Sequence, residues 1–164
     1  MKRRNFIALS ATAPIVLNTY LNASNIDEEI WITIQKVQNV LFPKGAKMPS
    51  AKQFGSVDYL KQNINHETFD KNDATLILDG AKVFKDTFPE FFTGNKKNQL
   101  EIVKEANNSE YGNSWIKTLV YYGIEAMLSD PIYGGNKFQS GWMALKHKSG
   151  SPRPKKRYGA KINV

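Results

Sequence analysis

Apolar side chains recur at spacings of three and four residues along most of this chain, and that period predicts α-helices. The clearest stripe lies between residues 25 and 43 and consists of Ile26, Ile30, Ile34, Val37 and Leu41. Asn25 is expected to cap this helix, because Glu28 stands in the capping-box position three residues later. Pro43 is expected to end it, since proline has no N–H to continue the helical hydrogen bonds.

Three further segments predict shorter or less regular helices. Residues 50–64 predict a short helix capped by Ser56. Residues 70–88 place on one face Ile77, Ala81, Phe84 and Phe88. Gly80 lies within that face, where it lowers helix propensity by ~1 kcal/mol relative to alanine, so we expect a second helix to approach closely there. In residues 95–108 the inward positions are Leu100, Val103 and Ala106.

The segment 113–128 is apolar over most of its circumference. One stripe consists of Trp115, Leu119, Tyr122 and Ala126, and beside it lie Ile116, Val120, Gly123 and Met127. Such a helix belongs at the centre of a bundle, and Asp130–Pro131 is expected to end it. Because no segment shows the alternation typical of a strand, the chain is predicted to be all-α. We expect a small irregular bundle of about five helices with an irregular basic C-terminal tail.

The net charge of +8 is concentrated at the two ends of the chain. Residues 1–23 carry +3, residues 24–128 carry 12 basic and 14 acidic groups, and residues 129–164 carry +7. A near-neutral middle argues against a nucleic-acid partner, which favours a broadly basic surface. Three parts are predicted: a leader at 1–23, a helical domain at 24–150 and a basic extended tail at 151–164.

Arg3 and Arg4 precede Asn5, Phe6 and Ile7, after a short basic start and before a modest apolar stretch. That order resembles a twin-arginine signal peptide, with Arg3, Arg4 and Phe6 as its characteristic residues. The predicted location is therefore the periplasm, reached through the twin-arginine translocase. The alternative is an ordinary first helix with basic residues at its start. The segment is too short and too polar for a spanning helix, which needs ~20 mostly apolar residues.

The sequence contains no recognisable catalytic or cofactor-binding motif. It has no cysteine, which excludes disulfides, thiolate nucleophiles and Cys-ligated metal centres. Its two histidines, His66 and His147, are far apart, and no serine lies in a G-x-S-x-G nucleophile motif. Glu125 lies in the most apolar segment, where a buried carboxylate paired with a lysine or arginine is expected.

Residues 130–137 read D-P-I-Y-G-G-N-K, and the adjacent glycines invite comparison with phosphate-binding loops. Such loops follow a strand and open a helix, with G-x-G-x-x-G or G-x-x-x-x-G-K-[ST] spacing. Here the glycines follow a helix and the spacing differs, so phosphate binding is not predicted. Two interpretations remain open: a loop that docks a partner, and a turn that packs only on its own bundle.

The same loop, together with the R-R-N-F-I leader, resembles the small subunit family of gluconate 2-dehydrogenase, also called subunit 3 or the gamma subunit. The residues that match the family's D-P-x-Y-G-G-N and G-W hallmark are Asp130, Pro131, Tyr133, Gly134, Gly135, Asn136, Gly141 and Trp142. The continuation from Gly150 through Arg153 to Tyr158 is also similar. The stretch M-A-L-K-H-K-S-G departs from the family, because it is more polar and basic than the usual apolar run.

The resemblance implies a non-catalytic accessory subunit of a periplasmic, membrane-associated FAD-dependent dehydrogenase of the glucose–methanol–choline type. FAD would be bound by the large partner subunit and haem c by a cytochrome c subunit, with no cofactor in this chain. The small subunit would stabilise the flavoprotein and assist its twin-arginine export. The hallmark residues and Arg153 are the expected docking residues.

Two other functions stay open. One is a stand-alone periplasmic binding module that uses its basic tail on an acidic partner or lipid surface. The other is an enzyme acting alone, with Glu125, Asp130 and Tyr133 as its acidic and phenolic groups.

Overall fold

The computed structural model describes residues 26–157, and these form helices joined by turns and loops without a strand, which confirms the all-α prediction. The predicted signal residues Arg3, Arg4 and Phe6 lie outside the described residues. No helix in the described part of the chain combines the length and the apolar character that crossing a bilayer requires.

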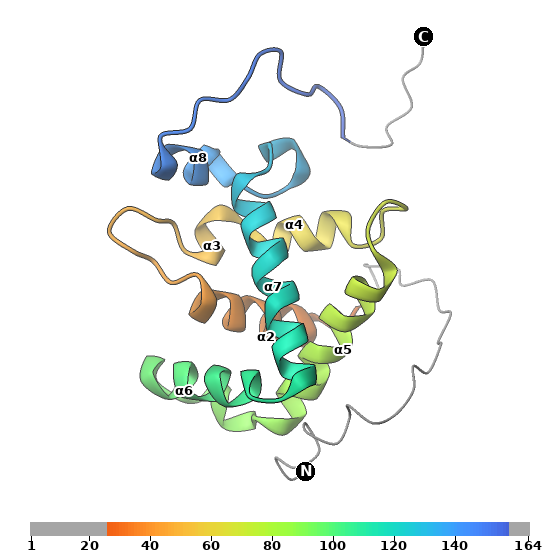
Figure 1. The fold of residues 1–164 in the computed structure, drawn as a ribbon, viewed down its shortest axis with the longest axis vertical. Helices are drawn as coiled ribbons and strands as arrows, with labels where there is room; N and C mark the ends of the chain where they lie inside the picture. Colours follow the sequence, from red (N-terminus) through yellow and green to blue (C-terminus); the bar gives the residue numbers. More distant parts are fainter. Residues whose placement is uncertain (1–25, 158–164) are drawn as a thin grey trace.

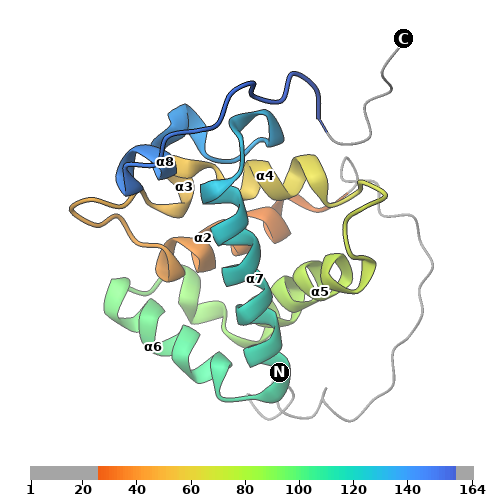
Figure 2. The same ribbon diagram turned by 45° about the horizontal axis from the view of Figure 1, so that its top comes forward.

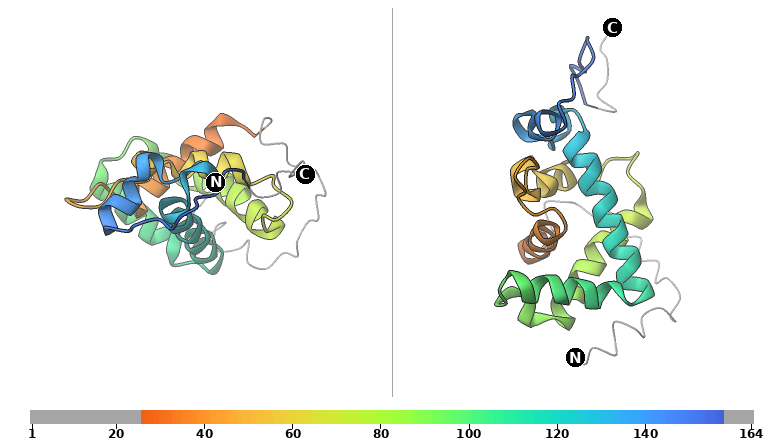
Figure 3. Two further views of the ribbon diagram at one scale, coloured as in Figure 1. Left: turned by 90° about the horizontal axis from the view of Figure 1, so that it is seen from above. Right: turned by 60° about the vertical axis from the view of Figure 1, so that its left-hand side comes forward.

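The helix α7 (Glu110–Leu128) runs through the middle of the molecule, as Figure 1 shows. It contacts α2 (Glu28–Leu41), α3 (Ala51–Phe54), α4 (Ser56–Asn63), α5 (Lys71–Thr87), α6 (Lys96–Asn107) and α8 (Ser140–Leu145). Seen from the side, α8, the α3–α4 pair, α2 and α6 lie one above another along α7 (Figure 3). Short 3-10 turns, η3 (Pro89–Phe92), η4 (Pro131–Tyr133) and η5 (Lys137–Gln139), join these helices.

The central position predicted for α7 is confirmed by its burial. Trp115, Leu119 and Ala126 are fully buried, and Tyr122 is nearly so, whereas Val120 is only partly buried. The helix begins at Glu110, before the predicted residue 113, because the Ser109 side chain accepts a hydrogen bond from the Gly112 N–H and caps it there.

The close approach predicted at Gly80 is also confirmed. A Cβ atom at Gly80 would lie 2.2 Å from Cδ1 of Trp115. The Trp115 indole Nε1–H donates to the carbonyl of Ile77 on the same helix, at 3.1 Å. The missing side chain on α5 therefore makes room for the largest side chain on α7.

The structure corrects several predictions about which residues cap the helices and where the helices begin. Asp27, not Asn25, caps α2, because its carboxylate accepts from the Glu29 N–H at 3.0 Å. Ser56 is the buried first residue of α4 rather than its cap. Residues 50–64 form two helices, because Gly55 adopts a φ of +78° between them and Ser50 makes a capping box with Gln53.

The remaining helices differ from the predictions in two ways. On α6, Leu100 is 43% exposed, and Ile102 is buried in its place. The helix α8 was not predicted, since its six residues are too few to show a period. The split at Gly55 and the added α8 explain why residues 26–157 contain seven α-helices rather than about five.

Candidate functional site

The loop that follows α7 folds into the two 3-10 turns η4 and η5 before α8 begins. Asp130 starts it, because its Oδ1 accepts from the Ile132 N–H at 3.1 Å. Pro131 then occupies the first position of η4, where a missing N–H costs nothing.

Three glycines allow the loop and the start of α8 to pack closely against α4 and α7. Gly134 has a φ of +91°, a conformation that favours glycine. A Cβ atom at Gly135 would lie 2.2 Å from the carbonyl oxygen of Ala126, and one at Gly141 would lie 2.1 Å from that of Met127. The backbone of the loop and of α8 therefore contacts the backbone of α7 where no side chain fits.

Two side chains, Asn136 of the loop and Trp142 of α8, complete the hydrogen bonds at the end of α7. Asn136 is fully buried; its Nδ2 donates to the Ser129 carbonyl at 3.0 Å, and its Oδ1 accepts from the Gly141 N–H at 2.9 Å. The Trp142 indole Nε1–H donates to the Leu128 carbonyl at 2.7 Å. These bonds satisfy carbonyl groups that a helix end leaves without intrahelical partners.

Side chains from α4 hold the other side of the loop. The Gln62 Nε2 donates to the Ile132 carbonyl at 3.0 Å, and the Asn63 Nδ2 donates to the Tyr133 carbonyl at 2.8 Å. The Lys137 ammonium pairs with the Asp58 carboxylate at 2.6 Å. The loop is thereby fixed to both α4 and α7.

The basic tail folds back onto the same loop, and Figure 2 shows it crossing the end of the molecule above α8. The Arg153 guanidinium donates to both oxygens of Asp130, at 2.9 and 3.0 Å, and lies 5.3 Å from the centre of the Trp142 ring. This hydrogen-bonded ion pair holds the pKa of the Asp130 carboxyl below its usual range. Further along, the Arg157 Nε donates to the Ile132 carbonyl at 3.0 Å.

The structure thus brings all the residues expected to dock a partner into one cluster, but most of their side chains face inward. Asn136 is 0%, Trp142 7% and Tyr133 9% exposed. Their contacts are with the chain's own helices, as the turn-only interpretation expects. A docking partner would have to contact other side chains of this end of the molecule.

Such side chains exist on η5 and α8, and sequence reasoning missed them. Phe138 is 90% exposed, Met143 65% and Leu145 51%. Phe138 also has a φ of +55°, which is uncommon for a bulky residue. Three large apolar residues beside the G-W pair, in a stretch that is otherwise polar, were the available indication.

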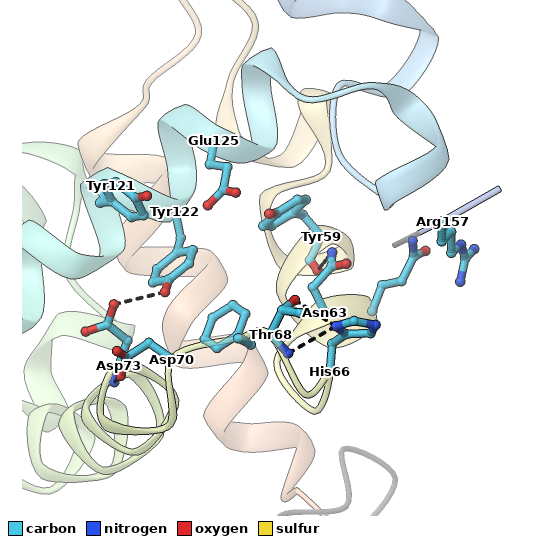
Figure 4. A pocket seen from close by; sticks show the side chains of 12 residues that line it. Tyr59, Asn63, His66, Thr68, Asp70, Asp73, Tyr121, Tyr122, Glu125 and Arg157 are labelled. Atoms are coloured by element: carbon cyan, nitrogen blue, oxygen red, sulfur yellow. Dashed lines mark hydrogen bonds between the residues drawn. The ribbon is translucent and has the colours of Figure 1, made fainter. Parts of the chain in front are cut away.

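A separate hollow lies between α4, the start of α5 and the C-terminal half of α7 (Figure 4). It has a volume of about 590 Å³, and its lining includes Tyr59, His66, Asp73, Tyr122, Glu125 and Arg157. The Tyr122 hydroxyl donates to Asp73 Oδ2 at 2.9 Å. Burial and this hydrogen bond raise the pKa of the Tyr122 phenol.

The expected lysine or arginine partner of Glu125 is not found among residues 26–157, where Glu125 is partly buried at the wall of the hollow. Asp130 and Tyr133, grouped with it as candidate enzymatic residues, do not line that hollow. Within the same range, no group of three histidine, aspartate or glutamate side chains could hold a metal ion.

Comparisons with protein-family models, with curated proteins and with solved structures found no match to this chain.

Proposed function

We propose that this chain is a non-catalytic accessory subunit of a periplasmic, membrane-associated FAD-dependent dehydrogenase of the glucose–methanol–choline type, such as gluconate 2-dehydrogenase. It docks on the large flavoprotein subunit and stabilises it. The twin-arginine leader serves both chains, and electrons pass from FAD to haem c in a cytochrome c subunit. The resemblance of the D-P-x-Y-G-G-N and G-W residues and of the leader motivates the choice of partner.

The observation that carries the docking proposal is the conformation of Phe138. An aromatic ring that is 90% exposed at a φ of +55° loses backbone energy and gains little from packing on its own chain. Strain of this kind persists when surrounding structure enforces it, and here the fixed loop does so. Aromatic anchors held on a rigid support are typical of the residues that dominate binding at protein interfaces.

The alternative, a stand-alone module that uses its basic tail on an acidic partner or lipid surface, has less support. Two of the tail's cations, Arg153 and Arg157, bind the chain's own loop. Because these two side chains bind within the chain, fewer charges of the tail are available to bind a second surface.

The test is co-expression of this chain with candidate large flavoprotein subunits from the same genome, followed by affinity purification from the periplasm. We expect a yellow complex that contains a flavoprotein of several hundred residues, and loss of membrane-bound dehydrogenase activity when this chain is deleted. Phe138→Ala should weaken binding by at least about tenfold, as for an anchor residue. Leu100→Ala, at an exposed apolar position on α6 away from the loop, should leave binding unchanged.

Two results would contradict the proposal, the first its accessory role and the second its docking residue. One is purification of this chain alone while the dehydrogenase stays active and correctly located in the deletion strain. The other is equal binding by the Phe138 and Leu100 variants, which would remove Phe138 as the anchor.

A further inference from the structure

We propose that the hollow between α4, α5 and α7 is a binding site for a small organic cation, with an ammonium or guanidinium group on a partly apolar body. This inference does not depend on the proposed function, because the hollow shares none of the docking side chains on η5 and α8.

The dimensions of the hollow suit a small molecule. Its volume of about 590 Å³ lies within the range of about 300–1,000 Å³ that ligand pockets occupy. Helices supply much of its wall: Tyr59 and Asn63 from α4, Asp73 from α5, and Tyr121, Tyr122 and Glu125 from α7. The rest comes from the loop between α4 and α5 and from the tail. Helices hold such side chains in fixed positions, so the site exists before a ligand arrives.

The charge of the hollow is what selects a cation. Asp70, Asp73 and Glu125 line it, and no cation among residues 26–157 lies within ion-pair distance of Asp73 or Glu125. The Asp70 carboxylate is already engaged, because its Oδ1 accepts the N–H groups of Asn72 and Asp73. Asp73 gives one oxygen to the Tyr122 hydroxyl. The Glu125 carboxylate and the second Asp73 oxygen are left to bind a ligand.

The cationic groups of the lining lie away from these carboxylates. In Figure 4, Glu125, Tyr122 and Asp73 occupy one part of the hollow, and His66 and Arg157 occupy the other. Arg157 is held by its bond to the Ile132 carbonyl, and the His66 ring lies against the Thr68 hydroxyl at 2.8 Å. A partly buried carboxylate such as that of Glu125, with no cation among residues 26–157 within ion-pair distance, is stabilised when an incoming cation pairs with it.

Aromatic side chains beside the carboxylates favour an organic cation. Phe69 and Tyr122 stack with their ring centres 4.6 Å apart, and Tyr121 meets Tyr122 edge-on at 5.0 Å. Tyr121 is 61% exposed and precedes Glu125 by one helical turn, so its ring and that carboxylate are neighbours on α7. An ammonium or guanidinium group gains both an ion pair and a cation–π contact in such surroundings.

A bare metal ion fits this lining less well. A divalent cation such as Ca²⁺ takes 6–8 oxygen ligands that converge on one point. The described residues contain no group of three carboxylate or histidine side chains close enough to do so. The aromatic walls would contribute nothing to a hydrated metal ion.

Isothermal titration of the purified full chain tests the proposal with two probes. Agmatine represents a free organic cation, and N-acetyl-arginine amide represents an arginine side chain of a peptide. We expect saturable binding of at least one probe, and the tighter of the two identifies the source of the cation. Gluconate serves as the anionic counterpart and should not bind in the hollow.

Variants then locate the binding. Glu125→Gln should weaken binding of the cation by about tenfold or more, as expected for loss of a partly desolvated ion pair. Glu101→Gln removes the same charge from an exposed position on α6 and should leave binding unchanged. Tyr121→Ala is a second test if the Glu125 variant unfolds, since this exposed ring is not part of the core.

The proposal is overturned if neither probe binds at millimolar concentration, or if gluconate binds and the cations do not. It is also overturned if the Glu125 and Glu101 variants lose affinity equally, since binding would then follow net charge rather than the hollow.

Discussion

Asp130 and Arg153 form a two-point ion pair, 2.9 and 3.0 Å long, that joins the end of the central helix to the C-terminal tail. Twenty-three residues separate the two in sequence. The Asp130 side chain is 10% exposed, so its carboxylate is largely removed from water, whereas Arg153 is 40% exposed. The pair explains why a tail rich in lysine and arginine follows the surface of its own bundle.

Loss of this pair should free the tail. Asp130→Asn removes the charge but keeps the shape, and Arg153→Lys keeps the charge but loses the two-point geometry. Trypsin should cleave both variants faster at Lys155 and Lys156, and Asp130→Asn should be cleaved faster than Arg153→Lys. Mass spectrometry of timed digests measures the rates, with Asp86→Asn as a control at an exposed position. Unchanged cleavage in both variants would show that the tail is held by other contacts.

The same contact predicts a pH dependence. The pKa of Asp130 is lowered in the folded protein from its ordinary 3.8, so its contribution to stability is fully present above that value. It is lost as the pH falls through the lowered folded pKa. Tryptic sites in the tail are therefore expected to stay protected through mild acidification. An NMR titration of the tail amides should show release only below about pH 4; release near pH 6 would point to a different titrating group.

Gly135 should not tolerate a side chain. Alanine there would place Cβ 2.2 Å from the Ala126 carbonyl oxygen, and backbone atoms cannot move aside as a flexible side chain does. We expect the free energy of unfolding to fall by about 1–3 kcal/mol or more, the usual cost of overpacking. Gly150→Ala is the matched control, since no atom lies within 4 Å of its added Cβ. Urea denaturation of both variants measures the difference, and equal stabilities would contradict the loop's packing.

At Gly80 two effects oppose each other, and their sizes decide the outcome. Alanine in a helix interior gains ~1 kcal/mol of propensity over glycine. The added Cβ would lie 2.2 Å from Trp115, which is fully buried and bonded to the Ile77 carbonyl. Displacing that ring should cost about 1–3 kcal/mol, so Gly80→Ala is expected to destabilise overall. Thermal denaturation and tryptophan fluorescence test this, and a more stable Gly80→Ala variant would show that the ring moves freely.

Asn136 should be essential because it is fully buried and bonded at both ends. Asn136→Ala leaves the Ser129 carbonyl and the Gly141 N–H without their partner, at a cost of about 1–3 kcal/mol for each group that remains buried. Asn136→Gly relieves the φ of +45° but restores neither bond, so it should recover only part of the stability. Chemical denaturation compares these variants with Asn65→Ala at an exposed position. Full recovery by glycine would mean that the backbone conformation, not the hydrogen bonds, requires asparagine.

Periodic helices were predictable because their information is local. The stripes around Ile34, Phe84 and Leu119 follow from the 3.6-residue period, and all three residues are fully buried. The glycine at position 80 even predicted a helix–helix contact, although the identity of Trp115 as its neighbour required the fold. Helix ends were less predictable, since Asn25 and Asp27 are both good caps and only the backbone path selects Asp27.

The loop at 130–137 shows the limit of sequence reasoning most clearly. Its composition predicted a loop whose glycine spacing does not match that of a phosphate-binding loop. The same residues suit both a loop that docks a partner and a turn that packs only on its own bundle. The tertiary structure turns Tyr133, Asn136 and Trp142 inward and leaves Phe138 outside, because the unfilled positions at Gly135 and Gly141 let the backbone reach α7.

Sequence by itself therefore determined the helical class, the central helix, the loop's position and the uneven charge, all of which depend on neighbouring residues along the chain. Only the tertiary structure decided which side chains of the loop are accessible, that Arg153 binds Asp130, and that Asp73 and Glu125 line one hollow. The last two of these facts bring together residues that are 23 and 52 positions apart in the sequence. Such contacts form through packing, which no local period records.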